Sequence, residues 1–318
     1  MLAYFVWDFE PLLIHIWGPI EIRWYGLIFV CTLLAGFVLW RWQMRRGGFS
    51  KEVIESFIIW GALATIVGAR LGHCFFYDIL PAGMAGRLTD SQYMRNPLKL
   101  LAFWEGGLAS HGAAVGLLLA LWGFARHYKI PFIEVLDRFA PSAAIGSAGI
   151  RLGNFLNSEI VGRVTDVPWA VQFVRAREPY LQLDPRHPSQ LYEFAMGLLV
   201  LLIVCLADRL ARRERRPRGL LAGLFLLLYF AGRFCVEFVK EYQALEGQQS
   251  ALTMGQYLSI VPMLVGAALL VWGLFRLVPT RLEGQAVPLV DPPAGRAAQK
   301  NPAPSAGAKR RRRRRQKK

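Results

Sequence analysis

The stretch from Arg151 to Arg163 carries two arginines, two asparagines and a glutamate directly after a long apolar run rich in small residues. Charged and amide side chains at the edge of a membrane-spanning segment are costly, so they face a protein interior or a wet cavity and mark a site. A guanidinium group suits phosphate because its planar fork offers paired donors and a charge that does not titrate away. The stretch therefore indicates a site for an anion, with Asn154 and Asn157 available for hydroxyl or ester oxygens.

The apolar residues are gathered in blocks that suit a membrane. The chain has 318 residues, 54% of them hydrophobic, which exceeds the usual apolar share of a soluble domain. Several blocks approach the roughly 20 residues that a bilayer-crossing helix requires. We therefore predict an all-α polytopic membrane protein with seven crossings, at about residues 24–40, 54–77, 108–125, 133–150, 191–206, 220–238 and 256–275.

Positive charge is concentrated in short loops and in the C-terminal tail. A formal net charge of +16 on a soluble face would suggest nucleic acid, but topology explains this distribution, so no nucleic-acid partner is expected. The loops after the first, third and fifth crossings are short and basic, and so is the tail, whereas the loops after the second, fourth and sixth crossings are longer and mixed in sign. Because lysine and arginine favour the cytoplasmic side, the N-terminus is predicted outside and the C-terminus in the cytoplasm.

The composition changes after about residue 278. Proline, alanine, glycine and basic residues take over, and the chain ends in a basic run from Lys309 to Arg315. We predict a seven-helix transmembrane domain over residues 1–278 and a disordered basic tail over residues 279–318. The basic run could bind acidic lipid headgroups or nucleic acid, but we favour a charge that retains the tail in the cytoplasm.

Three further features concern the N-terminal segment, the loop after the fourth crossing and the cysteines. Residues 1–22 are apolar but interrupted by acidic residues and prolines, which suits a segment at the membrane surface better than a crossing. The portion from Val164 to Arg175 could hold a short hairpin. The four cysteines stand singly inside apolar blocks, so neither a disulfide framework nor a metal site is expected, and we interpret them as small core residues.

The predicted orientation brings polar residues from different crossings to one depth. They fall in the outer half of the bilayer or at its outer surface, and they are Tyr25, Arg70, His73, His111, Arg151, Glu193, Arg233 and Glu237. Polar residues that fell within these helices by chance would be distributed over both halves of the bilayer. Three arginines, histidines and carboxylates at one depth therefore favour a site over a purely structural explanation.

Members of this set also have structural alternatives. Arg70 and Arg233 could extend to the outer headgroups with no further role. Glu237 could be the helical ion-pair partner of Arg233, which lies four residues earlier. Tyr25 and Tyr229 could be aromatic residues of the interfacial belt.

At the outer half of a bilayer, the abundant phosphate belongs to a phospholipid headgroup. His111 lies beside the glycine-rich stretch from Glu105 to Gly112, which would let a substrate approach its ring, although it could also be an ordinary helix-start residue. An imidazole with an unperturbed pKa near 6.5 can accept a proton from an attacking group. Arginine and histidine together thus suit chemistry on a phospholipid.

At these residues the chain closely resembles the prolipoprotein diacylglyceryl transferases of bacterial membranes. The sequence Arg-Leu-Gly-Asn-Phe-Leu-Asn at 151–157, followed by Glu159 and Gly162-Arg163, is similar to the signature segment of that family. Further matches are the segments 23–26 (Arg-Trp-Tyr-Gly), 68–70 (Gly-Ala-Arg), 106–112, 187–193 (His-Pro-Ser-Gln-Leu-Tyr-Glu), Tyr229 with Arg233 and Glu237, and 254–256 (Met-Gly-Gln). The ordered set is specific and covers most of the chain.

The resemblance implies transfer of the sn-1,2-diacylglyceryl group from phosphatidylglycerol to the lipobox cysteine of a prolipoprotein, in the bacterial inner membrane. It also implies a seven-span fold with no metal and no organic cofactor. On this basis the expected catalytic residues are His111, Arg151, Tyr229 and Arg233. The expected substrate-binding residues are Tyr25, Arg70, Asn154, Asn157, Glu159, Arg163, Glu193 and Glu237.

This chain departs from the family pattern in two places. Ser158 stands where glycine is usual, and the tail after about Val278 has no counterpart. The base that takes the thiol proton, His111 or Tyr229, stays open.

Two other functional classes compete with the transferase. A transporter or flippase that binds an anionic lipid or solute would use intramembrane arginine and histidine equally well. Such proteins often show repeated halves and broken helices, and the sequence has no convincing internal repeat. A scaffold whose basic tail recruits partners would leave the outer polar set unused.

Overall fold

The computed structural model describes residues 4–17, 20–80, 91–101, 107, 109–241 and 251–276. They belong to one folded unit, Met1–Val287, and the second unit is Pro288–Lys318. The predicted basic tail, residues 279–318, lies outside the described residues.

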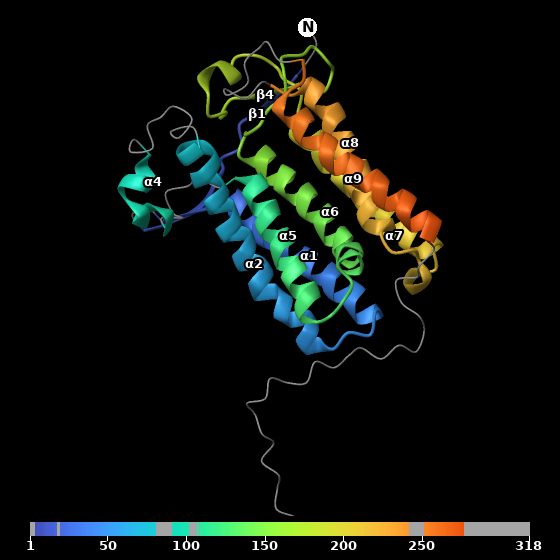
Figure 1. Ribbon diagram of the computed structural model, residues 1–318. Helices are drawn as coiled ribbons and strands as arrows, with labels where there is room; N and C mark the ends of the chain where they lie inside the picture. Colours follow the sequence, from blue (N-terminus) through green and yellow to red (C-terminus); the bar gives the residue numbers. More distant parts are fainter. Residues whose placement is uncertain are drawn as a thin grey trace, which may run out of the picture. The chain divides into compact units, whose positions relative to one another are not determined.

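Each predicted crossing coincides with a long helix (Figure 1). These helices are α1 (Trp24–Arg46), α2 (Lys51–Cys74), α5 (Ser110–His127), α6 (Phe132–Leu156), α7 (Ser189–Leu210), α8 (Leu220–Val236) and α9 (Met254–Arg276). Shorter helical turns are η1 (Phe75–Ile79), α4 (Gln92–Arg95), η3 (Pro97–Leu101), η5 (Pro179–Leu181), η6 (Arg213–Arg215) and η7 (Glu237–Val239).

Among the described residues, five helical segments are long and apolar enough to cross a membrane. They correspond to α1, α2 with η1, α7, α8 with η7, and α9. The chain is therefore a helical, multi-pass membrane protein. Helices α5 and α6 are not among the five, so the seven crossings and the positions of the two termini stay predictions.

Helix α6 lies at the centre of the packing. It contacts α1 on one side and α7 and α8 on the other, while α2 pairs with α5 and α8 with α9 (Figure 1). Its many alanine and glycine residues permit this close approach. A Cβ atom on Gly149 would lie 2.0 Å from the hydroxyl of Thr32 on α1, and Gly197 on α7 packs against Ala148.

The pairing of α2 with α5 also depends on glycines spaced four residues apart. A Cβ atom added to Gly116 would lie 2.2 Å from the carbonyl oxygen of Ala64, and one on Gly112 would lie 2.3 Å from that of Gly68. No larger side chain fits at these distances without moving backbone. Close backbone contact at small residues every fourth position is typical of helix pairs in membranes.

We expect Gly116→Leu to destabilise the protein by about 3 kcal/mol, because an inserted side chain must push α2 and α5 apart. Thermal unfolding in detergent micelles measures the effect. Gly123→Leu is the matched control on the same helix, since nothing lies within 4 Å of a Cβ atom at that position. Equal loss of stability in both variants would contradict the packing argument.

Two small sheets qualify the prediction of an all-α fold. Strands β2 (Leu12–Trp17) and β3 (Ile20–Arg23) form an antiparallel pair in the segment predicted to lie at the membrane surface. The hairpin predicted within residues 164–175 is wrong, because β4 (Val171–Phe173) instead pairs in parallel with β1 (Phe5–Trp7). Phe173 is buried in an apolar cluster that includes Trp7 and Phe155, and this burial favours the long-range partner.

A network of buried charges joins the helix ends that lie opposite the Arg151 end of α6. Arg138 of α6 donates to Glu134 at 3.0 Å and to Glu214 at 2.7 Å, and Arg216 lies 2.7 Å from Asp208 of α7. Arg46 of α1 pairs with the same Asp208 and Glu214, which connects α1, α6 and α7. Buried charges need such partners. The basic loop around Arg216 therefore has a structural role besides the topological one.

The four cysteines are free, but the prediction that they are core residues holds only in part. Cys74 is buried, Cys205 is half-buried, and Cys31 and Cys235 are exposed on the helix surface. In a membrane protein an apolar residue can face lipid as well as the core, so apolar surroundings in sequence do not distinguish the two positions.

Candidate active site

The carboxylate of Glu193 connects three helices at one end of the bundle. Glu193 lies near the start of α7 and its side chain is fully buried. One carboxylate oxygen lies 3.0 Å from Nε of Arg151, near the end of α6, and the other lies 3.2 Å from Nη1 of Arg233, near the end of α8. The two arginines predicted to bind one phosphate are thus brought together by a shared carboxylate.

Lys240 completes the cluster, and the sequence analysis missed it. Its ammonium lies 3.7 Å from Glu193 and 3.3 Å from Glu237, and the side chain is almost fully buried. Burial lowers the pKa of Lys240, and the carboxylate of Glu193 opposes that shift. In sequence its one signal is the three-residue spacing from Glu237, which many surface pairs share.

The structural alternative for Glu237, an ion pair with Arg233, does not hold. Among the described residues Glu237 pairs with Lys240 and not with Arg233. Its carboxylate packs against the first turn of α9, where a Cβ atom on Gly255 would lie 2.4 Å from a carboxylate oxygen. The positive end of the α9 dipole favours a carboxylate there. Only glycine permits this contact, which explains the segment Met254-Gly255-Gln256.

The ion-paired cluster carries an excess of positive charge. Arg151, Arg233 and Lys240 supply three positive charges against two negative charges from Glu193 and Glu237, a net charge of +1. Toward the described residues, Nε and Nη2 of Arg233 make no hydrogen bond. The side chains of Arg151 and Arg233 are 12% and 20% exposed, so neither is completely closed off from the surface. Such a cluster suits a monoanion that accepts paired hydrogen bonds.

The two tyrosines predicted for the site lie on either side of Arg151. Tyr229 is buried one helical turn before Arg233 and stacks on Phe225 with ring centroids 5.5 Å apart, so it is not a belt residue. Its hydroxyl interacts with Arg151. Tyr25, at the start of α1, packs its ring on Gly153, where a Cβ atom would lie 2.7 Å away. Both phenols therefore border the arginine.

Asn154, Asn157 and Glu159 form a short polar chain at the end of α6. The amide of Asn157 lies 3.3 Å from Glu159, and Asn154 contacts Glu159 and Arg151 at 3.5 Å each. The side chain of Gln190 donates to the carbonyl oxygen of Glu159 at 2.7 Å. This chain connects the signature segment to the start of α7, close to Glu193.

Arg163 contacts the backbone next to the cluster. Its Nε donates to the carbonyl oxygen of Lys240 at 2.9 Å, and its backbone N–H donates to Val239 at 2.8 Å. Gly162 fits between His187 and Val239, with a Cβ position 2.5 Å from the carbonyl oxygen of His187. Arg163 therefore holds the backbone of Lys240 in place.

Arg70 and His111 belong to a second group on α2 and α5. Arg70 is only 2% exposed, so it does not extend to the headgroups, and it donates to the carbonyl oxygens of Lys99 at 2.6 Å and Leu100 at 3.2 Å. The ring of His111 lies 4.8 Å from that of Phe76 and 5.8 Å from that of Tyr77. Within the described part of the chain, no ion pair or hydrogen bond connects this group to Glu193.

Comparison with known proteins identifies the family of this chain. The family model for prolipoprotein diacylglyceryl transferase matches residues 11–272. The chain belongs to the prolipoprotein diacylglyceryl transferase family. Relatives named phosphatidylglycerol-prolipoprotein diacylglyceryl transferase include one from Cupriavidus pinatubonensis, 38% identical over 83% of this chain and 91% of the relative. Another, from Nitrosomonas europaea, is 37% identical over 83% of this chain and 90% of the relative.

The matched range, residues 11–272, spans every residue predicted for the site and also Lys240, and the roles of these residues stay predictions. Within this range, Ser158 stands where the resemblance to the family predicts glycine. The φ angle of Ser158 is +54°, in the left-handed region that favours glycine, and that of Ile160 is +57°. This tight turn after α6 therefore places a non-glycine residue in a strained backbone conformation.

Proposed function

We propose that this protein transfers the sn-1,2-diacylglyceryl group of phosphatidylglycerol to the thiol of a prolipoprotein lipobox cysteine. The observation that carries the proposal is the binding of Arg151 and Arg233 to one buried carboxylate, with net charge +1 on the cluster. A phosphodiester carries one negative charge and accepts paired hydrogen bonds from guanidinium groups. The names of the relatives indicate the same two substrates for those proteins.

In the proposed reaction, negative charge develops on the leaving phosphate, next to the positively charged cluster. The thiolate sulfur attacks the sn-3 carbon of the diacylglyceryl group, the carbon–oxygen bond to phosphate breaks, and glycerol 1-phosphate leaves with the bonding electrons. The leaving phosphate gains a second negative charge, which Arg151 and Arg233 stabilise. Preorganised donors of this kind act most strongly in a site shielded from water. Glu193 holds both arginines in position before the substrate arrives.

His111 takes the proton of the thiol in this proposal. The thiolate is the nucleophile, and a free cysteine with a pKa near 8.5 is mostly protonated at neutral pH. At neutral pH an imidazole is more readily available as a general base than a phenol, which favours His111 over Tyr229. Tyr229 instead orients the headgroup beside Arg151.

We expect His111→Gln to reduce thiol alkylation by about 100-fold or more, because general-base catalysis typically contributes 100- to 10,000-fold. The rate of modification of a lipobox peptide measures the effect. His127→Gln at the other end of α5 is the matched control and should retain the wild-type rate. A fully active His111→Gln variant would make Tyr229 or a carboxylate the base.

For the topology we propose seven crossings, with the N-terminus outside and the C-terminus in the cytoplasm of a bacterial inner membrane. If helices α5 and α6 also cross, consecutive long helices cross the membrane in alternating directions. The short turn between α5 and α6 is basic, as expected on the cytoplasmic side. In this orientation Glu193 and its partners face the outer leaflet, where an exported prolipoprotein arrives. Cysteine labelling on both sides of the membrane tests it.

The tail, residues 279–318, has no role in the proposed transfer. We expect a protein truncated after residue 284 to transfer at the wild-type rate, because the family match ends at residue 272. Turnover of the purified truncated protein checks this expectation. Loss of activity at normal protein levels would give the tail a part in catalysis.

The proposed activity is tested with purified protein, phosphatidylglycerol and a lipobox peptide. Transfer raises the mass of the peptide by one diacylglyceryl group and releases glycerol 1-phosphate, and a cysteine-to-serine peptide should stay unmodified. Movement of lipid across a vesicle membrane with no change in peptide mass would indicate a transporter instead.

A further inference from the structure

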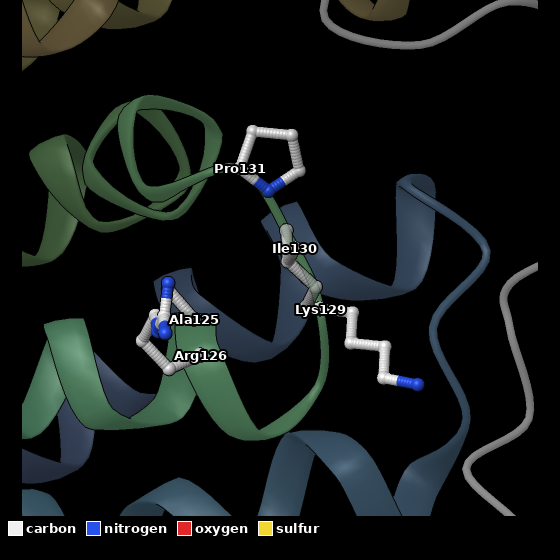
Figure 2. A pocket seen from close by; sticks show the side chains of 5 residues that line it. All are labelled: Ala125, Arg126, Lys129, Ile130 and Pro131. Carbon is white, nitrogen blue, oxygen red and sulfur yellow. The ribbon is translucent and has the colours of Figure 1, made fainter.

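A hollow at the turn between α5 and α6 lies far from the candidate active site. It has a volume of about 520 Å³ and is lined by Ala125, Arg126, Lys129, Ile130 and Pro131 (Figure 2). Volumes between about 300 and 1,000 Å³ are usual for ligand sites. From Phe132, at the start of α6, to Arg151 is a helical distance of about 28 Å, so this hollow is separate from the Glu193 cluster.

The hollow is basic, and its charges are not neutralised. Neither Arg126 nor Lys129 forms an ion pair with any carboxylate of the described residues. The nearest acidic residue in sequence, Glu134, is engaged by Arg138 and Arg218. The guanidinium of Arg126 lies 6.0 Å from the ring centroid of Trp122. Arg126, without an ion pair among the described residues, lies beside an exposed tryptophan, with Lys129 three residues further on, as is typical of an anion site at an interface.

The backbone conformation at Lys129 is strained. Lys129 has a φ angle of +53°, in the left-handed region that favours glycine. A lysine here accepts strain that a glycine would avoid. In Figure 2 its side chain extends outward from the turn, separate from that of Arg126.

An apolar face of α5 leads directly to the hollow. Val115, Leu119, Trp122 and Arg126 follow one another at spacings of four, three and four residues, which places them on one face of the helix. The three apolar residues are all more than half exposed. Val115 and Arg126 are separated by a rise of about 16 Å, close to the roughly 15 Å of hydrocarbon in one leaflet.

We infer that this face and hollow bind one anionic phospholipid, with its phosphate at the basic turn that carries Arg126 and Lys129 and its acyl chains along Val115, Leu119 and Trp122. The apolar face favours a lipid over free phosphate, because an inorganic anion would use only the two cations. The site is distinct from the one that binds the substrate lipid, and the inference does not depend on the proposed transfer.

The test compares lipid retention by native mass spectrometry of the full chain, titrated with phosphatidylserine or with zwitterionic phosphatidylcholine. The variant is Arg126→Gln with Lys129→Gly, since glycine suits the left-handed backbone and protects the fold. We expect roughly 25-fold weaker retention of one phosphatidylserine, about fivefold for each cation near a bilayer surface. Retention of phosphatidylcholine should not change.

The matched control is Arg45→Gln with Arg212→Gly, because both arginines are exposed at the same end of the bundle and Arg212 has a φ angle of +60°. It removes the same charge and should retain lipid as the wild type does. Equal retention by all three proteins, or equal loss in both variants, would overturn the inference. Binding of inorganic phosphate by the lipid-free protein that phosphatidylserine does not displace would also overturn it, in favour of a soluble anion.

Discussion

Glu193→Gln is expected to reduce diacylglyceryl transfer by about 100-fold or more and to lower stability. The substitution keeps the shape of the side chain but removes the charge that holds Arg151 and Arg233. Removing one partner of a buried ion pair costs roughly 3–5 kcal/mol, because the remaining charges are left buried and uncompensated. Turnover of a lipobox peptide and thermal unfolding in detergent measure the two effects.

Glu55→Gln provides the control for this prediction. Glu55 forms an exposed ion pair with Lys51 at 3.8 Å, and exposed pairs contribute little to stability. The control should resemble the wild type in both measurements. If Glu193→Gln also behaved as the wild type, the shared carboxylate would not be the element that positions the two arginines.

Arg151→Lys is expected to reduce transfer by roughly 100- to 1,000-fold, the range for removal of one preorganised donor to a developing oxyanion. Lysine keeps the charge but loses the planar fork, and its single ammonium cannot bind Glu193 and a phosphate oxygen with fixed geometry. The loss should appear mainly in kcat, because the donor matters most when charge develops on the leaving phosphate.

A conservative change elsewhere controls for the substitution itself. Arg175→Lys alters an exposed arginine that pairs with Asp8 and Glu10, outside the cluster. It should leave kcat unchanged. If Arg151→Lys kept the wild-type kcat, Arg151 would provide charge alone, and paired hydrogen bonding to phosphate would be excluded.

The sequence predicts the helices well because hydrophobic length is the dominant constraint in a membrane. Every predicted crossing coincides with a helix, and the glycine and alanine content of α6 agrees with its close packing against α1 and α7. The sequence does not predict the pairing of β1 with β4, because three-residue strands separated by more than 160 residues leave no periodic signal. Their pairing depends on burial of Phe173 among residues distant in the chain.

In the candidate site, too, the sequence predicts some of the contacts and not others. The predicted convergence of Arg151, Glu193 and Arg233 agrees with the structure, since their order along alternating helices places them at one end. Lys240 was missed, because a lysine in a mixed loop is usually solvated. Arg70 donates to loop carbonyl oxygens, a contact that no helical spacing reveals, and its binding to substrate stays a prediction.

The central claim is that the guanidinium groups of Arg151 and Arg233 both bind the phosphate of phosphatidylglycerol. Solid-state NMR distance measurement between ¹⁵N-labelled arginine and the lipid ³¹P nucleus tests it in bilayers, with Arg151→Lys and Arg233→Lys proteins used for assignment. We predict nitrogen–phosphorus contacts within about 4 Å, the range of a charge-assisted hydrogen bond plus one P–O bond, and partial loss of the signal in each variant. Contacts that persist unchanged in both variants, or a phosphate close to neither arginine, would contradict it.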